Sequence, residues 1–444
     1  MLRDEQALTP YTVDLLKVYG ARPRFVVRPG NTEEVAAVVA CCAEEGVPMV
    51  PFGGNTGFCG GSMAKGDREQ VVIALGRMNR IRWVDPAGDT IGVDAGCVLA
   101  AARAAAEAQG RLLPLSHGGE GSSEIGGNLG TNAGGLNVLR YGMARELVLG
   151  LEVVLPDGRV LDMMRTLRKD NTGYDLKQFF VGAEGTLGII TGAVLKLFPL
   201  PRRRETAFVA VTSTEGAVEL LGRIRAEVGS RMSAFELVPR RGLDLVLAFD
   251  AAARDPLESK HAWYVLMELE GEGLQPALEK VMAEGLVMDA VLAHSEAQRA
   301  ALWRMRENLA VAQVAERSTL KNDTAVPIGA IPEFIRQASA AVETLAPGVR
   351  PVPFGHIGDG NIHFNMLKPE ALAPDAFIAL WPALVRAVED VALALGGSVS
   401  AEHGIGQSKR EALRRARSAV ELDLMHAIKQ ALDPKGLMNP GKIL

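Results

Sequence analysis

Cysteine is scarce in this chain of 444 residues, which contains only Cys41, Cys42, Cys59 and Cys97. None of them forms a C-x-x-C pair, and the adjacent Cys41 and Cys42 cannot easily bridge to each other. A reduced thiol state in the cytoplasm is therefore the simple prediction. The same shortage excludes an iron–sulfur cluster, because such a cluster needs a set of thiolate ligands at suitable spacing.

Long apolar runs and basic clusters are also missing. No run approaches the roughly 20 apolar residues that cross a bilayer, so we expect no transmembrane segment. The N-terminus has no basic segment followed by an apolar core, so we expect no signal peptide. A net charge of −5, without basic residues interleaved with aromatics, argues against a nucleic-acid partner. A peripheral position at the inner face of the membrane stays compatible with this composition.

A chain of this length normally divides into two or three domains. Residues 24–50 predict strand, helix and strand, with Asn31 or Thr32 as the helix cap. The glycine-rich character fades at Pro199-Leu200-Pro201, where we place a domain boundary. Beyond it, strands and helices alternate. Apolar residues alternate along 261–270, which predicts a half-exposed antiparallel strand.

Histidine is scarce too, and three of the seven histidines lie in two short patches. The patch 356–365 holds His356 and His363, and the patch 402–406 adds Glu402 and His403. Two imidazoles and a carboxylate form an N/N/O ligand set for a divalent transition metal with open coordination positions. The sequence therefore predicts a metal-assisted reaction.

Glycine, by contrast, is abundant in three loops. The loop 51–57 follows a predicted strand, residues 118–142 contain nine glycines, and a third loop covers 182–190. So many glycines cannot form an ordinary helix or strand. Glycine loops let the backbone approach a ligand and turn N–H groups toward phosphate oxygens. Three such loops suit a dinucleotide as large as FAD, although the pattern is not a Rossmann fingerprint.

At these residues the chain resembles the FAD-linked oxidases of the vanillyl-alcohol-oxidase/PCMH superfamily, in the branch of D-2-hydroxyacid dehydrogenases. That branch includes D-2-hydroxyglutarate and D-lactate dehydrogenases and the glycolate oxidase D subunit. The resemblance covers residue 24 to the C-terminus, and its most specific strings are 125–135, 168–176, 182–188, 356–363, 402–406 and 438–441.

The resemblance implies an α+β fold. A PCMH-type FAD-binding domain of two α/β subdomains would cover 1–200. A substrate and metal domain, with an antiparallel sheet covered by helices, would cover 201–420, and 421–444 would return to the first domain. It also implies noncovalent FAD. The residues implied to contact the cofactor are Pro51, Gly53, Gly54, Asn55, Thr56, Gly57, Pro114, Leu115, Gly121, Ser122, Ile125, Gly126, Gly127, Asn128, Thr131, Asn132, Gly134, Gly135, Gly142, Glu184, Gly185, Gly188, Ile190, Asn361 and Asn439.

The resemblance further implies roles in catalysis. His356, His363 and Glu402 match the metal ligands, with Zn²⁺ expected before Mn²⁺, Fe²⁺ or Co²⁺. His403 matches the base that takes the hydroxyl proton before hydride passes to flavin N5. The residues that match substrate contacts are Arg306, Lys321 and Asn365.

One departure bears on the substrate. Ala310 stands where hydroxyglutarate-type relatives often carry a threonine, which removes a hydroxyl donor for a distal carboxylate. D-2-hydroxyglutarate, D-lactate and similar acids therefore stay open as substrates.

The resemblance also suggests partners. The expected electron acceptor is a quinone or an electron-transfer flavoprotein, and the expected assembly is a homodimer. Two alternatives remain: an FAD-binding subunit of a glycolate oxidase-type complex, and a flavoprotein oxidase of another alcohol.

Overall fold

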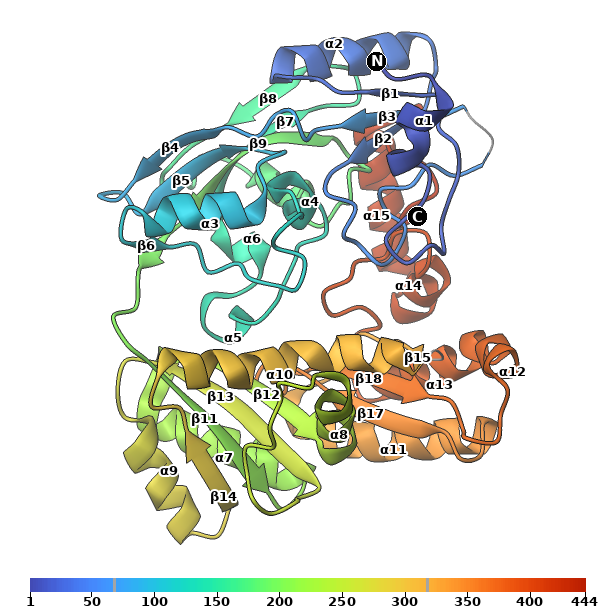
Figure 1. Ribbon diagram of the computed structural model, residues 1–444. Coiled ribbons are helices and arrows are strands. Elements are labelled where there is room, and N and C mark those ends of the chain that lie inside the picture. Colours follow the sequence, from blue (N-terminus) through green and yellow to red (C-terminus); the bar gives the residue numbers. More distant parts are fainter. Residues whose placement is uncertain (67–68, 317–318) are drawn as a thin grey trace. The chain divides into compact units, whose positions relative to one another are not determined.

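The computed structural model describes residues 1–66, 69–316 and 319–444, which form two compact units (Figure 1). The first unit contains Met1–Gly135, Tyr141–Leu200 and Glu402–Leu444. The second contains Leu136–Arg140 and Pro201–Ala401. Helices and sheets occur in both units, as expected for the predicted α+β class.

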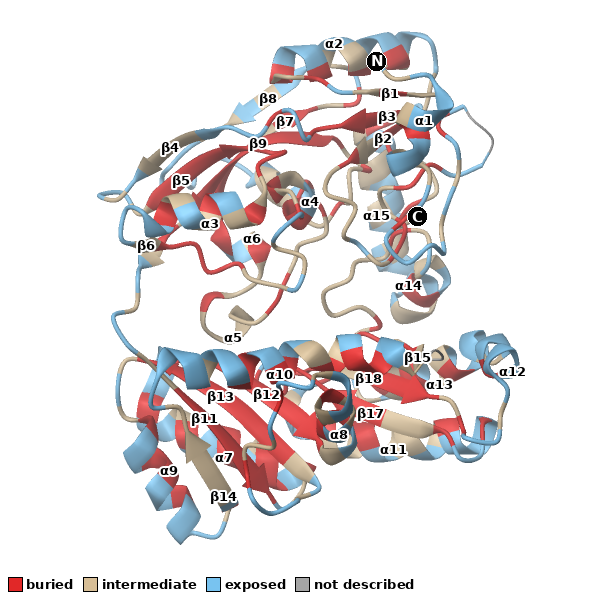
Figure 2. Ribbon diagram, in the orientation of Figure 1, coloured by how far each residue is buried: buried red, intermediate tan, exposed pale blue. Residues whose placement is uncertain are grey.

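The first unit contains a small parallel sheet and a larger antiparallel one. The parallel sheet has the order β1 (Phe25–Val27), β3 (Val71–Ala74), β2 (Met49–Phe52). The antiparallel sheet has the order β4 (Ile81–Asp85), β5 (Thr90–Asp94), β9 (Ile189–Lys196), β7 (Val148–Val154), β8 (Val160–Met163). A short pair joins β6 (Arg111–Leu112) to β10 (Phe198–Pro199). The central strands are buried (Figure 2).

Among the helices of the first unit, α4 (Ile125–Gly130) was not expected. It forms within 118–142, where the glycine content predicted no ordinary helix, so that prediction is wrong. The longest helix near the N-terminus, α2 (Thr32–Glu44), is capped by Asn31, whose side chain accepts from the Glu34 N–H at 2.8 Å. Its buried stripe includes Val35, Val39 and Cys42. The other helices of this unit are α1 (Glu5–Leu8), α3 (Leu99–Glu107), α4 (Ile125–Gly130), α6 (Ala144–Leu147), α14 (Arg410–Ala416) and α15 (Ala419–Leu432), with single 3₁₀ turns at Thr9–Tyr11 and Leu176–Phe179.

The C-terminal segment belongs to the first unit through direct backbone pairing. The Met49 N–H donates to the Leu437 carbonyl at 2.8 Å, and the Asn439 N–H donates to the Met49 carbonyl at 2.7 Å. These bonds extend the edge of β2, the strand that leads into the loop 53–57. The chain's last residues therefore support the same loop that the sequence assigns to a cofactor.

The second unit is built on two antiparallel sheets. The first has the order β12 (Met232–Pro239), β13 (Trp263–Glu270), β11 (Arg204–Val211), β14 (Val287–Leu292). In the second, β18 (Asn361–Leu367) pairs with β15 (Thr319–Leu320), β16 (Thr324–Ala325) and β17 (Arg350–Phe354). The helices of this unit are α5 (Val138–Tyr141, of which the first three residues belong here), α7 (Thr214–Val228), α8 (Arg240–Phe249), α9 (Leu274–Ala283), α10 (Glu296–Ala315), α11 (Ile331–Leu345), α12 (Pro374–Ala379) and α13 (Trp381–Ala394), with 3₁₀ turns at Gly229–Arg231 and Ile328–Ala330.

Strand β13 corrects one sequence-based expectation. The alternation of residues 261–270 predicted a strand with one exposed face, but nearly all of β13 is buried. Val265 and Met267 pack into a core with α7 and α9, while Tyr264 and Leu266 pack into another with α8 and α10. Because helices cover both faces, the polar members of the pattern are buried as well and must be paired.

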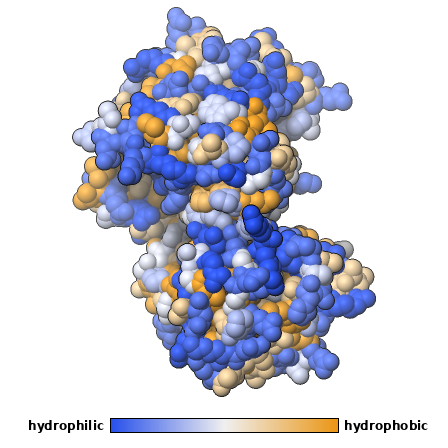
Figure 3. Space-filling model, turned by 90° about the vertical axis from the view of Figure 1, so that its left-hand side faces the viewer, coloured by the Kyte–Doolittle hydropathy of each residue, from blue (hydrophilic) through white to orange (hydrophobic). Residues whose placement is uncertain are grey.

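No helix in the three described stretches is long and apolar enough to cross a membrane. In Figure 3, the face in view is mostly hydrophilic, with small hydrophobic groups scattered over it.

Candidate functional site

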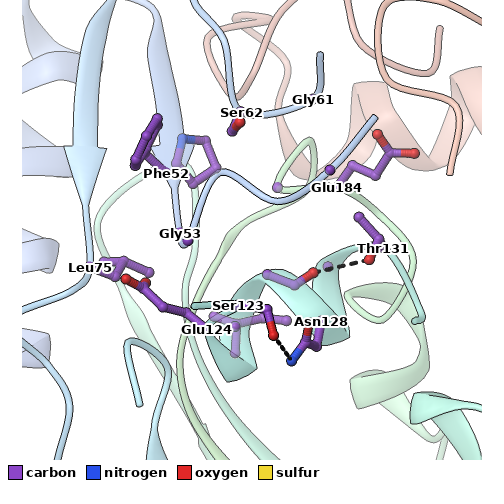
Figure 4. Close-up of a pocket in the computed structure, with 18 of the residues that line it drawn as sticks. Phe52, Gly53, Gly61, Ser62, Leu75, Ser123, Glu124, Asn128, Thr131 and Glu184 are labelled. Carbon is purple, nitrogen blue, oxygen red and sulfur yellow. Dashed lines mark hydrogen bonds between the residues drawn. The ribbon is translucent and has the colours of Figure 1, made fainter. Parts of the chain in front are cut away.

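The loop after β2 forms one wall of a pocket in the first unit (Figure 4). Its backbone fits closely: a Cβ on Gly54 would lie 2.0 Å from the Ser122 carbonyl oxygen. Asn55 has a φ of +53°, a left-handed conformation that side chains seldom adopt. The strand, the tight turn and the close approach to Ser122 together hold this loop against the glycine-rich segment 118–135.

Other glycines leave space in the pocket where side chains would otherwise lie. A Cβ on Gly57 or Gly127 would meet nothing within 4 Å, and both residues line the cavity. Asn128 and Thr131 lie beside them; Asn128 donates to Ser123 Oγ at 3.3 Å and Thr131 to the Gly127 carbonyl at 3.2 Å (Figure 4). An elongated polar ligand with phosphate groups, such as FAD, fits this glycine-lined cradle.

The predicted cofactor residues separate into two groups. Those that line the pocket are Pro51, Gly53, Gly54, Asn55, Thr56, Gly57, Gly126, Gly127, Asn128, Thr131, Glu184, Gly185, Gly188 and Ile190. Those outside its lining are Pro114, Leu115, Gly121, Ser122, Ile125, Asn132, Gly134, Gly135, Gly142, Asn361 and Asn439.

Three asparagines of the second group form hydrogen bonds within the protein: Asn132 and Asn439 in the first unit, and Asn361 in the second. Asn132 accepts from the Arg145 N–H at 2.9 Å. Asn439 donates to the carbonyls of Gly61 and Glu184, at 3.0 and 2.7 Å. Asn361 lies in the second unit, where it donates to Asp323 at 3.0 Å and to the Thr324 carbonyl at 2.8 Å.

Glu184 positions the His403 loop at the pocket. Its carboxylate accepts from the Ile405 N–H at 2.7 Å and from the Gly406 N–H at 2.8 Å. Burial raises the pKa of Glu184, although these two backbone donors oppose that shift. His403 lines the pocket with its ring centroid 4.7 Å from that of Phe58, and its Nε2 lies 4.0 Å from Glu402 Oε1. An imidazole therefore faces the cofactor cradle.

Glu124 is a pocket residue that the sequence reasoning missed. It precedes α4 without capping it, and its Oε2 is buried with no hydrogen-bond partner in the described part of the chain. Burial raises the pKa of Glu124 to about 7. In Figure 4 it lies beside Leu75, across the pocket from Glu184. The sequence shows a carboxyl group among the glycine loops, but it does not show that this group is buried.

In the second unit, His356 and His363 lie side by side. Their ring centroids are 5.4 Å apart. His356 Nδ1 lies 2.7 Å from Glu236 Oε1, and His363 Nδ1 lies 3.8 Å from Asp323 Oδ1. Carboxylates that hold one ring nitrogen orient an imidazole for metal binding through the other nitrogen. The donor types of both rings, and the Glu236 contact that orients His356, fit the predicted ligand pair.

Glu236 joins this pair to Arg306. Its Oε2 accepts from Arg306 Nε at 2.6 Å, while its Oε1 contacts His356. Burial alone would raise the pKa of Glu236, but Arg306 and His356 outweigh burial and hold the pKa at about 2. Arg306 also lies over the Phe354 ring, 5.2 Å from its centroid. The buried guanidinium is thus held by an ion pair through its Nε and by an aromatic ring.

Glu236 was also missed from the sequence. It lies in the buried strand β12, 70 residues before Arg306 and 120 before His356. An acid inside a strand whose every residue is buried was the signal, because such an acid needs a partner.

The remaining predicted residues of the second unit belong to a polar network. Asn365, two residues after His363 on β18, donates to Gln313 Oε1 at 2.9 Å and accepts from the Asn322 N–H at 3.3 Å. Lys321 lies next to Asn322, and burial lowers its pKa. Ala310 lies on α10, one turn after Arg306. Glu402 and His403 belong to the first unit.

Known proteins resemble this chain along its length. Residues 23–164 match the family described as FAD binding domain, and residues 200–443 match FAD linked oxidases, C-terminal domain. The D-2-hydroxyglutarate dehydrogenase of Xanthomonas citri pv. viticola is 39% identical over 100% of this chain and 94% of its own length. That of Stutzerimonas stutzeri is 36% identical over 100% of this chain and 96% of its own.

Solved structures share the fold at low identity. p-Cresol methylhydroxylase with substrate bound has a TM-score of 0.78 at 18% identity, over 100% of this chain and 93% of that one. Alkyldihydroxyacetonephosphate synthase has a TM-score of 0.74 at 19% identity, over 99% and 82%. These neighbours confirm the predicted PCMH-type fold. Together with the glycine cradle, the family matches show that the chain belongs to the FAD-linked oxidases and is an FAD-dependent oxidoreductase.

Proposed function

We propose that the chain oxidises a D-2-hydroxy acid to the 2-oxo acid, with D-2-hydroxyglutarate as the first substrate to test. The observation that carries this proposal is Glu236, a buried carboxylate that orients both Arg306 and His356. Such an arrangement supplies a cation for a substrate carboxylate next to an imidazole pair. The full-length relatives named D-2-hydroxyglutarate dehydrogenase support the same substrate class.

Arg306 binds the substrate's 1-carboxylate through its Nη donors. A guanidinium can bind a carboxylate with two parallel hydrogen bonds, which fixes orientation as well as position. The Glu236 contact and the Phe354 ring hold the guanidinium plane before substrate arrives. Preorganisation of this kind places the reacting carbon without further ordering of the side chain.

His356, His363 and Glu402 bind a divalent cation, with Zn²⁺ as the first choice and Mn²⁺, Fe²⁺ or Co²⁺ as alternatives. The support is the N/N/O donor set and the Glu236 carboxylate that holds Nδ1 of His356. When bound, such a cation supplies positive charge that acidifies a hydroxyl group.

His403 takes the hydroxyl proton on a ring nitrogen. Its imidazole lines the cofactor pocket, and Glu184 holds the loop that carries it. An imidazole nitrogen that carries no proton can act as a general base. FAD, when bound, supplies the acceptor for the two electrons that leave the same carbon.

Asn365 and Lys321 contact the rest of the substrate. In this proposal the Lys321 ammonium pairs with the second carboxylate of a diacid substrate. The electron acceptor is a quinone or an electron-transfer flavoprotein. The homodimer, the cytoplasmic location and a peripheral position at the inner membrane face stay predictions.

An anaerobic flavin-bleaching panel tests the proposal. The FAD-loaded protein is mixed with D- and L-2-hydroxyglutarate, D- and L-lactate and glycolate, before and after treatment with a chelator. We expect bleaching by D-acids only, with the rate falling at least a hundredfold after chelation and returning when Zn²⁺ is added. Elemental analysis before and after chelation checks the metal content.

Other outcomes would contradict the proposal in separate ways. Bleaching by no 2-hydroxy acid would favour an oxidase of another alcohol. Bleaching unaffected by complete metal removal would reject the metal site alone. Absence of turnover by the isolated chain with an artificial dye acceptor would favour a noncatalytic subunit of a glycolate oxidase-type complex.

A further inference from the structure

Gln313 is an unusual residue in the last turn of α10. Its side chain is fully buried, with an exposed fraction of 0%. Oε1 accepts a hydrogen bond from Asn365 Nδ2, but Nε2 has no hydrogen-bond partner among the described residues. A buried donor without an acceptor costs free energy that a ligand with an acceptor could recover.

The direction of this donor follows from its neighbours. The Asn322 backbone N–H can only donate, so the Asn365 atom that it meets must be the carbonyl Oδ1. The Asn365 Nδ2 therefore donates to Gln313, and the accepting atom must be Oε1. These two hydrogen bonds identify Gln313 Nε2 as the donor that has no acceptor among the described residues.

Gln313 also lies on the side of α10 that carries the substrate-binding arginine. It follows Arg306 by seven residues, which is about two helical turns, so both side chains project from one face of the helix. Ala310 lies between them in sequence and carries only a methyl side chain. Asn365, the partner of Gln313, shares its strand face with His363, two residues away. One face therefore runs from the histidine pair and Arg306 to Gln313.

We propose that Gln313 Nε2 donates a hydrogen bond to an oxygen at the far end of the substrate and so determines which D-2-hydroxy acids the enzyme accepts. The inference rests on the proposed function, because it assumes that Arg306 binds the 1-carboxylate. Gln313, which bonds Asn365, and Lys321, which precedes Asn322 in the chain, then supply donors to a tail that ends in a second carboxylate. A substrate with an apolar tail would leave the amide unpaired, and sites built this way reject such analogues.

Two substrates of equal length test the idea. D-2-hydroxyglutarate ends in a carboxylate, and D-2-hydroxyvalerate ends in a methyl group at the same position. The measurement is kcat/KM for both acids in the FAD-loaded protein and in Gln313→Glu. This variant keeps an oxygen for Asn365 Nδ2 but replaces the donor with a negative acceptor. We expect kcat/KM for the diacid to fall at least a hundredfold and that for the monoacid to change less than threefold.

A second variant separates recognition from damage to the fold. Gln313→Leu removes the donor without adding charge, and it should lower the diacid-to-monoacid ratio of kcat/KM roughly tenfold, as for one lost hydrogen bond to a charged group. Gln275→Leu, on the exposed face of α9, is the matched control and should leave the ratio unchanged. FAD content and the thermal midpoint are measured for each variant.

The results distinguish this inference from the proposed function. Equal losses for both acids, or an unchanged ratio in both Gln313 variants, would overturn the role of Gln313 while leaving the dehydrogenase intact. Failure of the unaltered protein to oxidise either acid would instead reject the proposed function, and the inference with it.

Discussion

At the scale of the residue, the second unit depends on a single carboxylate. Glu236 is buried and pairs with two basic groups, Arg306 and His356, which hold its pKa at about 2. A buried charge that loses its counter-charge is far more costly than a surface ion pair that breaks.

Glu236→Gln should therefore destabilise the protein by about 3–5 kcal/mol, because Arg306 would keep its charge without a counter-ion. Flavin reduction should be lost in the same variant. Chemical denaturation of the FAD-loaded protein measures the first effect. Glu272→Gln, which removes an exposed carboxylate paired with Arg203, is the control and should change stability by less than about 1 kcal/mol. Equal effects of the two variants would contradict the role of Glu236.

Glu124 makes the stability of the cofactor-free protein depend on pH. Its pKa is about 7 in the fold and near 4.5 in the unfolded chain, so the folded state binds more protons between these values. Stability from this group is fully present below pH 4.5 and is lost as pH rises through 7. Glu124→Gln should thus stabilise the apoprotein by about 1–3 kcal/mol at pH 8 and by nearly nothing at pH 4.5.

Thermal or urea unfolding of the apoprotein across pH 4.5–8 provides the measurement for Glu124. Glu120→Gln, a partly exposed acid paired with Arg103, serves as the comparison and should show no such pH-dependent gain. A gain for Glu124→Gln that is constant across the pH range would contradict the burial argument.

At the scale of the element, the loop after β2 has two kinds of glycine. Gly54 lies against the Ser122 carbonyl, whereas Gly57 faces the open pocket. Gly54 is required by packing within the protein, and Gly57 is required by the space that a ligand needs.

Gly54→Ala and Gly57→Ala should consequently fail in different ways. A Cβ 2.0 Å from a backbone oxygen forces the loop to move, so Gly54→Ala should lower the stability of the apoprotein by about 2 kcal/mol or more. Gly57→Ala should leave that stability within about 0.5 kcal/mol but weaken FAD binding about tenfold. Denaturation and titration of apoprotein with FAD measure the two effects. Equal stability of both variants would contradict this division.

Sequence patterns predicted some elements well for a physical reason. The helix α2 carries its cap, its acidic first turn and its apolar stripe within fourteen residues, so local information suffices. Strand β13 shows the opposite case. Its alternation is visible, but the helices that cover its second face, α8 and α10, lie elsewhere in the chain. Periodicity reports which residues face each side, not whether a side is covered.

At the scale of the whole molecule, glycine density and rare histidines were enough to indicate a flavin cradle and a ligand pair. The family matches confirm that the chain is an FAD-linked oxidase, as the flavin cradle indicated. The two histidines of the predicted ligand pair lie side by side. Glu236, Gln313 and Glu124 could not be singled out, because each acquires its importance from contacts or burial that only folding creates. The sequence thus predicted the fold and chemical class better than the residues that tune the site.

The contacts of Glu236 with both Arg306 and His356 limit which substitutions this protein can accept. Since Glu236 contacts both the Arg306 guanidinium and the His356 imidazole, a substitution that moves one of these groups also disturbs the other. A laboratory selection that shifts the guanidinium would therefore disturb the imidazole at the same moment. Variants selected for a new substrate should keep the arginine, glutamate and histidine together and carry their changes at other positions.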